Sequence, residues 1–217
     1  MPSSTPDFTG RKVIVIGGTS GMGLDVARRV LEAGGSAVVT GRTQSGADRA
    51  VADLAAYGKA FGLAADLTYT QAVNQLRLNL TDQHADATLL VNAAGVFAPK
   101  SFLDHTPEDY DRYQAINRAF FFLTQTVVGN MINRGAQGAI VNIGSIWAHQ
   151  AVPTTPSSAY SMAKAGLHSL TQHLAVELAP HGIRVDTVAP EDVAGAIAFL
   201  LSGHAGPVTG GVLAGRG

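Results

Sequence analysis

The chain has 217 residues, of which 46% are hydrophobic and 14% charged, with a formal net charge of −1 and no cysteine. This length suits one domain, residues 1–217, with a single large core, and the near-neutral charge argues against a protein that binds nucleic acid or an anionic membrane. Without a signal-peptide pattern, without any stretch near the ~20 apolar residues of a membrane span and without thiols for disulfides, we expect a cytoplasmic protein.

Short apolar runs alternate with longer amphipathic runs along the chain. The short runs predict six buried strands, at residues 12–16, 36–40, 60–65, 88–91, 139–143 and 183–188. The longer runs predict helices at residues 24–33, 69–80, 107–131 and 157–178, with another helical stretch that ends near residue 57. Strands separated by helices in this order predict a parallel sheet covered on both faces, which is a doubly wound α/β fold.

Several loops that follow strands carry candidate site residues. Gly17, Gly21 and Gly23 lie between the first strand and its helix. Missing side chains there let the backbone turn tightly and approach a pyrophosphate at the helix N-terminus. Because ligands bind beyond the carboxyl ends of such strands, where the strand order reverses, the loops at 92–95 and 144–145 point to the same edge of the sheet.

Tyr160 and Lys164 are four residues apart in the helix expected at 157–178, so they share one face of it. A free tyrosine has a pKa near ~10, and a neighbouring cation favours the phenolate. We therefore expect Lys164 to lower the pKa of Tyr160 toward the range of a general acid. The ordinary alternative is a half-buried tyrosine beside a solvated lysine, and a lone pair of this spacing does not exclude it.

Five motifs, in order, resemble those of the short-chain dehydrogenase/reductase family. The resemblance runs over nearly the whole chain and implies a Rossmann-type sheet of about seven strands. The family's TGxxxGxG turn, NNAG, helix asparagine, serine after the fifth strand and YxxxK match residues 16–23, residues 92–95, Asn117, Ser145, and Tyr160 with Lys164.

The resemblance implies hydride transfer between a nicotinamide and a carbonyl or secondary alcohol. Tyr160 would protonate the nascent alkoxide, and Ser145 would orient the carbonyl oxygen. Lys164 would tune Tyr160 and hold the nicotinamide ribose, while Asn117 would position a water in the proton relay. Without the YxxxK pair, we would interpret Ser145 as a serine that caps the next turn and Asn117 as a buried amide that pairs with a helix backbone. The residues implied for the cofactor are Gly17, Thr19, Ser20, Gly21, Met22, Gly23, Arg42, Thr43, Asp66, Leu67, Asn92, Ala93, Ala94, Gly95, Ile143, Tyr160, Lys164 and Pro190.

Cofactor preference follows from the end of the second strand. An NAD site usually has a carboxylate there for the ribose hydroxyls, whereas this chain has Gly41 and Arg42, with no adjacent acid. A guanidinium suits a 2′-phosphate in charge and geometry, so NADP(H) is favoured. If Arg42 only stacks on adenine, NAD(H) would bind comparably.

The chain also departs from the family pattern. Pro190 runs directly into residues 191–201, the family's last helix, where a few tens of residues with the substrate-binding loop would be expected. Either the protein lacks this stretch or the sequence as given omits it. A protein without it could be a catalytically weak NADP(H)-binding sensor or scaffold instead of an enzyme.

Other functions find little support in the sequence. No GxSxG motif of a hydrolase is present, and no HExxH or similar spacing predicts a metal site. His168 and His173 are five residues apart, so we interpret them as surface or packing residues.

Substrate and assembly are inferred from apolar residues. Phe97, Trp147, His149 and Val152 would border the pocket in the family's geometry, which suggests an apolar ketone of moderate size. The helices expected at 107–131 and 157–178 carry more apolar residues than one sheet face requires. The family pairs these two helices across a two-fold axis, so we expect a homodimer through them, or a homotetramer.

Overall fold

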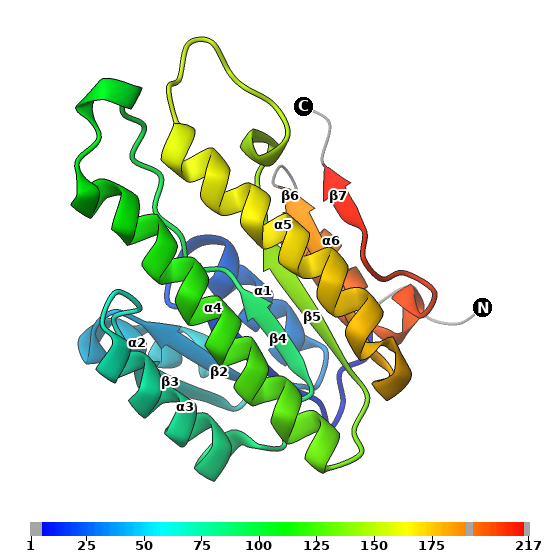
Figure 1. The fold of residues 1–217 in the computed structure, drawn as a ribbon. Helices are drawn as coiled ribbons and strands as arrows, with labels where there is room; N and C mark the ends of the chain where they lie inside the picture. Colours follow the sequence, from blue (N-terminus) through cyan, green and yellow to red (C-terminus); the bar gives the residue numbers. More distant parts are fainter. Residues whose placement is uncertain (1–5, 190–192, 215–217) are drawn as a thin grey trace.

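The structure is a computed structural model that describes residues 6–189 and 193–214, and it contains a seven-stranded parallel sheet (Figure 1). The order across the sheet is β3-β2-β1-β4-β5-β6-β7, so the direction of winding reverses between β1 and β4. This confirms the predicted doubly wound α/β fold. The strands are β1 (Lys12–Ile16), β2 (Ser36–Gly41), β3 (Ala60–Ala64), β4 (Leu89–Asn92), β5 (Gly138–Ile143), β6 (Ile183–Ala189) and β7 (Val212–Ala214).

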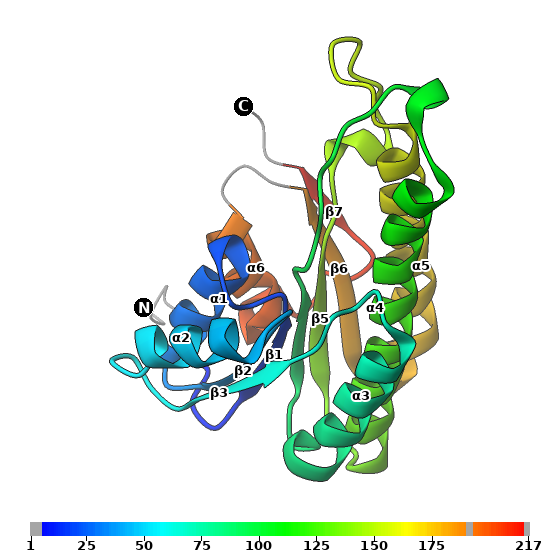
Figure 2. The same cartoon turned by 90° about the vertical axis from the view of Figure 1, so that its left-hand side faces the viewer.

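Helices cover both faces of the sheet (Figure 2). One face carries α1 (Gly21–Glu32), α2 (Gln44–Leu54) and α6 (Val193–Leu201), and the other carries α3 (Thr70–His84), α4 (Pro107–Asn133) and α5 (Ser158–Leu178). Four short 3-10 turns complete the described elements: η1 (Phe102–Asp104), η2 (Ile146–Ala148), η3 (Ala179–His181) and η4 (Gly203–Ala205).

The strand residues pack into two cores, one on each face. In β1, Val13 and Val15 pack with α1 and α6, whereas Ile14 and Ile16 pack with α3, α4 and α5. All four are completely buried. A strand buried on both faces is continuously apolar instead of alternating, which is why short uninterrupted apolar runs predicted the strands correctly.

A chain of buried polar side chains crosses the α4–α5 face of the sheet. Asn92 Nδ2 donates to Thr124 Oγ1 at 3.0 Å and to Asn142 Oδ1 at 2.8 Å. Asn142 Nδ2 in turn donates to Thr171 Oγ1 at 2.9 Å, and that hydroxyl lies 2.7 Å from Thr187 Oγ1. These contacts connect β4, β5 and β6 to α4 and α5 inside an otherwise apolar layer.

β7 completes one edge of the sheet, beside β6. Asp186 Oδ1 in β6 accepts the backbone N–H of Gly211 at 3.0 Å, just before β7. Only residues 190–192 connect β6 to α6, and the predicted start of the last helix, with Pro190, lies outside the described residues. Within residues 6–189 and 193–214, no helix combines the length and apolar character needed to cross a bilayer.

Candidate active site

The predicted site residues come from loops and helix ends at the carboxyl edge of the sheet. The arrowheads of the strands in Figure 1 point toward this edge, and the segments after β4 and β5 rise beyond it. β1 and β4, between which the strand order reverses, are adjacent in the sheet. The structure therefore places the glycine-rich turn after β1 and the loops after β4 and β5 at the position where doubly wound proteins bind ligands.

The glycine-rich turn is packed too closely for a side chain at Gly17 and Gly23. Gly17 has a φ of 86°, and a Cβ at this position would lie 2.5 Å from Ala94 Cα. Gly21, with a φ of 53°, is the first residue of α1, three residues earlier than predicted, and Gly23 is buried in the first turn of that helix. Ser20, the N-cap, makes no side-chain capping bond. The backbone N–H groups at the start of α1 thus remain available for an anion.

A hollow of about 680 Å³ opens beside this turn, at the end of β2. Arg49, on α2, faces this hollow together with Arg42, and the sequence analysis missed it because its contribution depends on how α2 packs. Asp66 accepts the backbone N–H and the hydroxyl of Thr68 at 2.9 and 2.7 Å, bonds that lower the pKa of its carboxyl, as does the nearby Arg42. Five of the predicted cofactor residues line the hollow, and Leu67, which follows Asp66, does not. The lining residues are Thr19, Ser20, Arg42, Thr43, Gly46, Arg49, Ala50, Asp53 and Asp66.

The segment after β4 lies against the glycine-rich turn through its backbone. The N–H groups of Ala93 and Ala94 both donate to the Ile16 carbonyl, at 2.8 and 2.7 Å. The side chain of Asn92 is buried and its Nδ2 donates within the buried polar chain, whereas its Oδ1 has no partner among the described residues. Gly95 is exposed, as is Met22 on α1.

The four predicted catalytic residues lie on α4, α5 and the loop after β5. Lys164 Nζ donates to the Ile143 carbonyl, at the end of β5, at 2.6 Å. Asn117 Nδ2 donates to the Ala163 carbonyl at 2.7 Å, which joins α4 to α5 one residue before Lys164. Ser145 is buried, and its Oγ accepts the backbone N–H of Trp147 at 3.3 Å.

The pKa of Tyr160 differs from expectation. Burial raises this pKa and Tyr113 raises it further, whereas a hydrogen bond with Ser145 lowers it. Lys164 Nζ lies 5.7 Å from the centroid of the Tyr160 ring and is directed to the Ile143 carbonyl. The predicted lowering by Lys164 is therefore wrong for this arrangement, because desolvation of the phenolate is the larger effect. Burial also lowers the pKa of Lys164 to about 8.

Aromatic rings surround Tyr160. The centroid of the Phe97 ring lies 5.0 Å from that of Tyr160 and 5.2 Å from that of Trp147. Trp147 and Tyr113 lie 6.4 and 5.8 Å from Tyr160. Two of the four residues predicted to border the pocket, Phe97 and Trp147, are thus beside the phenol.

A histidine pair supports the loop after β5. His168 Nδ1 lies 2.7 Å from His149 Nε2, and His168 Nε2 accepts the backbone N–H of Ser145 at 3.4 Å. Because Nε2 accepts, the proton of a neutral His168 lies on Nδ1 and is donated to His149. Burial, then the nearby His149 and Lys164, lower the pKa of His168 to about 4, which keeps this ring neutral. His168 is a packing residue, as expected, and it contacts the site, which the sequence analysis missed.

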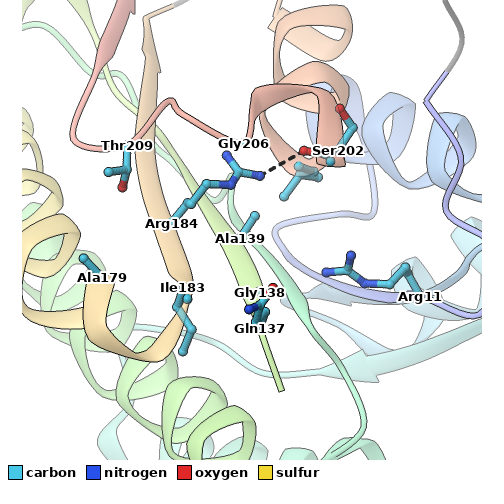
Figure 3. Close-up of a pocket in the computed structure, with 13 residues that line it drawn as sticks. Arg11, Gln137, Gly138, Ala139, Ala179, Ile183, Arg184, Ser202, Gly206 and Thr209 are labelled. Carbon is cyan, nitrogen blue, oxygen red and sulfur yellow. Dashed lines mark hydrogen bonds between the residues drawn. The ribbon is translucent and has the colours of Figure 1, made fainter. Parts of the chain in front are cut away.

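A second hollow, of about 430 Å³, lies at the opposite edge of the sheet (Figure 3). Arg11, which precedes β1, and Arg184 both face it, and Arg184 donates to the carbonyls of Leu200 and Ser202 at 2.6 and 3.0 Å. These bonds tie the end of α6 to β6. None of the predicted site residues lines this hollow, so we assign it no part in the site. In the part of the chain that the structure describes, no cluster of three His, Asp or Glu residues has the arrangement of a metal site.

Comparison with known proteins identifies relatives over most of the chain. Galactitol 2-dehydrogenase of Rhizobium johnstonii is 30% identical, with 94% of this chain and 93% of the relative aligned. L-xylulose reductase of Homo sapiens is 31% identical, with 95% of each chain aligned. The galactitol 2-dehydrogenase alignment spans 241 positions, more than the 217 residues present here, so this relative has residues without a counterpart in the chain.

Solved structures and a family model agree with these relatives. A structure described as an NAD(P)-dependent gluconate 5-dehydrogenase from Beutenbergia cavernae, with NADP bound at low occupancy, superposes with a TM-score of 0.89. It is 26% identical, and 96% of each chain is covered. The sequence model described as short chain dehydrogenase matches residues 11–199. With the fold, the glycine-rich turn and these matches in agreement, the chain belongs to the short-chain dehydrogenase/reductase family of oxidoreductases.

Proposed function

We propose that this protein transfers a hydride between NADP(H) and a small carbonyl compound or secondary alcohol. The observation that carries the proposal is that Tyr160, Ser145 and Lys164 lie beside the end of β5, at the same edge of the sheet as the glycine-rich turn. A dinucleotide on that turn can extend across the strand reversal toward Tyr160. In the described residues, we find a glycine-rich turn and a candidate proton donor at the same edge of the sheet only here.

The residues at this edge fit a dinucleotide. Gly21 faces open space and leaves room for a ligand to approach the backbone, and the start of α1 offers N–H groups to its pyrophosphate. Lys164 would hold the nicotinamide ribose, as the family resemblance implies. When bound, the cofactor supplies or accepts the hydride.

Preference for NADP(H) over NAD(H) is supported by the hollow at the end of β2. Arg42 and Arg49 both face it, and Ser20 and Thr43 add hydroxyl groups. Guanidinium groups bind a phosphate with charge-assisted hydrogen bonds. Asp66 also faces the hollow, but its carboxyl is held by Thr68, so it is less available to the ribose hydroxyls.

The chain's own groups would supply the proton chemistry. The raised pKa of Tyr160 keeps the phenol protonated near neutral pH, so it can donate a proton to the oxygen of a carbonyl that is being reduced. Ser145, whose side chain interacts with that of Tyr160, would bind the same oxygen and stabilise its developing charge. Lys164, with a pKa of about 8, lies one helical turn from Tyr160 and could supply the next proton. Asn117 donates to the carbonyl of Ala163, the residue before Lys164, and so connects α4 to this part of α5.

The substrate class follows from the pocket and the relatives together. The names of the relatives specify galactitol, L-xylulose and gluconate, in which the reacting carbon is flanked by carbons that carry oxygen. The aromatic rings of Phe97, Trp147 and Tyr113 around Tyr160 provide apolar walls. We propose a small ketone, or the corresponding secondary alcohol, as the substrate.

A cofactor titration beside a turnover assay tests the proposal. NADPH binding is measured by fluorescence, and NADPH oxidation is followed at 340 nm with a panel of small ketones and hydroxyketones. We expect binding and turnover with at least one of them. Binding without turnover on the whole panel would instead support the sensor or scaffold, and absence of binding would overturn both functions.

We further propose a homodimer through α4 and α5. Their outer faces form a hollow of about 610 Å³ with Phe121, Phe122 and Leu170 in its lining, and Phe121 is 46% exposed. A second copy would cover these apolar side chains. Light scattering should give twice the 22.4 kDa chain mass, or four times for a tetramer, and Phe121→Glu should reduce it. A single-chain mass for the unaltered protein would refute the proposal.

A further inference from the structure

The indole N–H of Trp147 is a buried donor without an acceptor. Nε1 is shielded from solvent, and it has no hydrogen-bond partner among the residues that the structure describes. An unpaired buried donor costs free energy, because water is lost and nothing replaces it. Native structures keep few such groups, and each calls for a physical explanation.

The backbone turn that carries the indole is held by hydrogen bonds on both sides. The Trp147 backbone N–H donates to Ser145 Oγ, inside η2. On the other side of η2, His149 pairs with His168 of α5, which also accepts the Ser145 N–H. The turn that carries the indole is therefore fixed to α5 at two neighbouring points.

The indole lies beside the proposed proton donor, Tyr160. Its ring is 6.4 Å from that of Tyr160, and Phe97, about half exposed, packs on both rings. A ligand whose carbonyl reaches the Tyr160 hydroxyl would therefore lie next to the phenol, Phe97 and the indole together.

An indole N–H donates and cannot accept, so its partner must be an oxygen with a free lone pair. We propose that Trp147 is a specificity-determining residue, and that its N–H donates to a second oxygen on the carbon next to the substrate carbonyl. The preferred substrates are then α-hydroxyketones, and vicinal diols in the reverse direction. This inference rests on the proposed function and adds the group that recognises the second oxygen.

A matched pair of substrates tests the inference in kinetics. Acetoin and butanone differ by one hydroxyl, on the carbon next to the carbonyl. Trp147→Phe keeps an aromatic ring and removes the N–H, so the ratio of kcat/KM for acetoin to that for butanone should fall by about five- to tenfold. Tyr113→Phe, which changes a neighbour of Tyr160 and leaves the indole N–H in place, should leave this ratio unchanged. An unchanged ratio in Trp147→Phe overturns the inference.

A spectroscopic measurement does not depend on turnover. Trp147 is the single tryptophan of the chain, so a nitrogen-15 correlation spectrum contains one indole N–H peak. In Tyr160→Phe with NADPH bound, acetoin should shift the indole proton downfield, whereas butanone should leave it nearly in place. Equal shifts with both ligands would overturn the inference.

The outcomes separate the two proposals. If the unaltered protein reduces both ketones but neither the ratio nor the peak responds to the hydroxyl, only the role of Trp147 fails. If it reduces neither ketone but the peak responds to acetoin, the N–H recognises the oxygen and the catalytic proposal fails. A Trp147→Phe variant with unchanged or higher Tm also excludes a purely structural role, because a tryptophan kept only for packing would lose stability when its larger ring is removed.

Discussion

The two halves of the candidate site are built in different ways. On the β1 side, the turn from Gly17 to Gly23 and the segment after β4 meet through backbone atoms, with glycines where a Cβ would not fit. On the β5 side, side chains set the geometry: His168 of α5 accepts the Ser145 backbone N–H and pairs with His149, and the Ser145 hydroxyl accepts the Trp147 N–H. Because the β1 half is joined through backbone atoms, we expect it to depend little on side-chain identity. A side chain at Gly17, however, would clash with Ala94. The second half depends on the identity of individual side chains.

Replacing Tyr160 tests the β5 half most directly. Tyr160→Phe keeps the ring and removes the proton, so kcat for ketone reduction should fall by about 10²–10⁴-fold, while NADPH binding is retained. Tyr113→Phe is a matched control, because Tyr113 packs 5.8 Å from Tyr160 and its hydroxyl donates to the Ala98 carbonyl. Its effect should be far smaller. Undiminished turnover in Tyr160→Phe would rule out the assignment.

Adding one methyl group tests the β1 half. In Gly17→Ala the new Cβ would lie 2.5 Å from Ala94, and the residue would need a φ of 86°. We expect the free energy of unfolding to fall by about 3 kcal/mol and NADPH binding to weaken, as measured by urea denaturation and titration. Gly129→Ala, in open space on α4, should be neutral or slightly stabilising. A Gly17→Ala protein as stable as the unaltered one would show that the turn is less closely packed.

The histidine pair predicts a pH dependence of stability. His168 has a pKa lowered to about 4 in the folded protein, against about 6.5 when unfolded. Between these values the unfolded chain binds more protons, so stability is lost as pH falls from about 6.5 to 4, by about 2 kcal/mol. In His168→Gln this part of the loss should disappear, whereas in His173→Gln, an exposed position on the same helix, it should remain. Chemical denaturation at a series of pH values measures the free energy of unfolding. If this free energy depended on pH equally in both variants, the prediction would be wrong.

The smallest expected effect concerns cofactor choice. Arg42→Asp should lower the ratio of kcat/KM for NADPH to that for NADH by about tenfold. The substitution removes the charge-assisted bond of the guanidinium, and the new carboxylate repels the 2′-phosphate. Arg49→Asp gives the matched measurement for the second guanidinium. If neither ratio moves, the hollow at the end of β2 does not bind the phosphate.

The fold and the β1 half could be predicted from the sequence because their signals are local. The predicted β1 range agrees with the structure, and the predicted α5 range, 157–178, differs by one residue. Helix starts were less certain: α1 begins at Gly21 because glycines there join the first turn, against their usual preference.

The β5 half could be predicted only as a set of residues. His149 and His168 are 19 residues apart, and nothing in their spacing shows that the loop between them folds back. The direction in which the pKa of Tyr160 shifts could not be predicted from the sequence either. It depends on how much solvent the rings of Phe97, Tyr113 and Trp147 remove, which residue spacing does not reveal.

The buried polar chain has a consequence for how the sheet is assembled. Asn92, Asn142 and Thr187 are direct partners across β4, β5 and β6. Most of the other buried residues of these strands are Val, Ile or Leu. Such side chains pack in more than one strand register, so they do not select a single one. A slip of one residue would turn these amides and hydroxyls to the opposite face and leave them unpaired. The polar chain thus selects one strand register, and Asn142→Leu should populate misaligned sheets that hydrogen exchange would detect in β4 to β6.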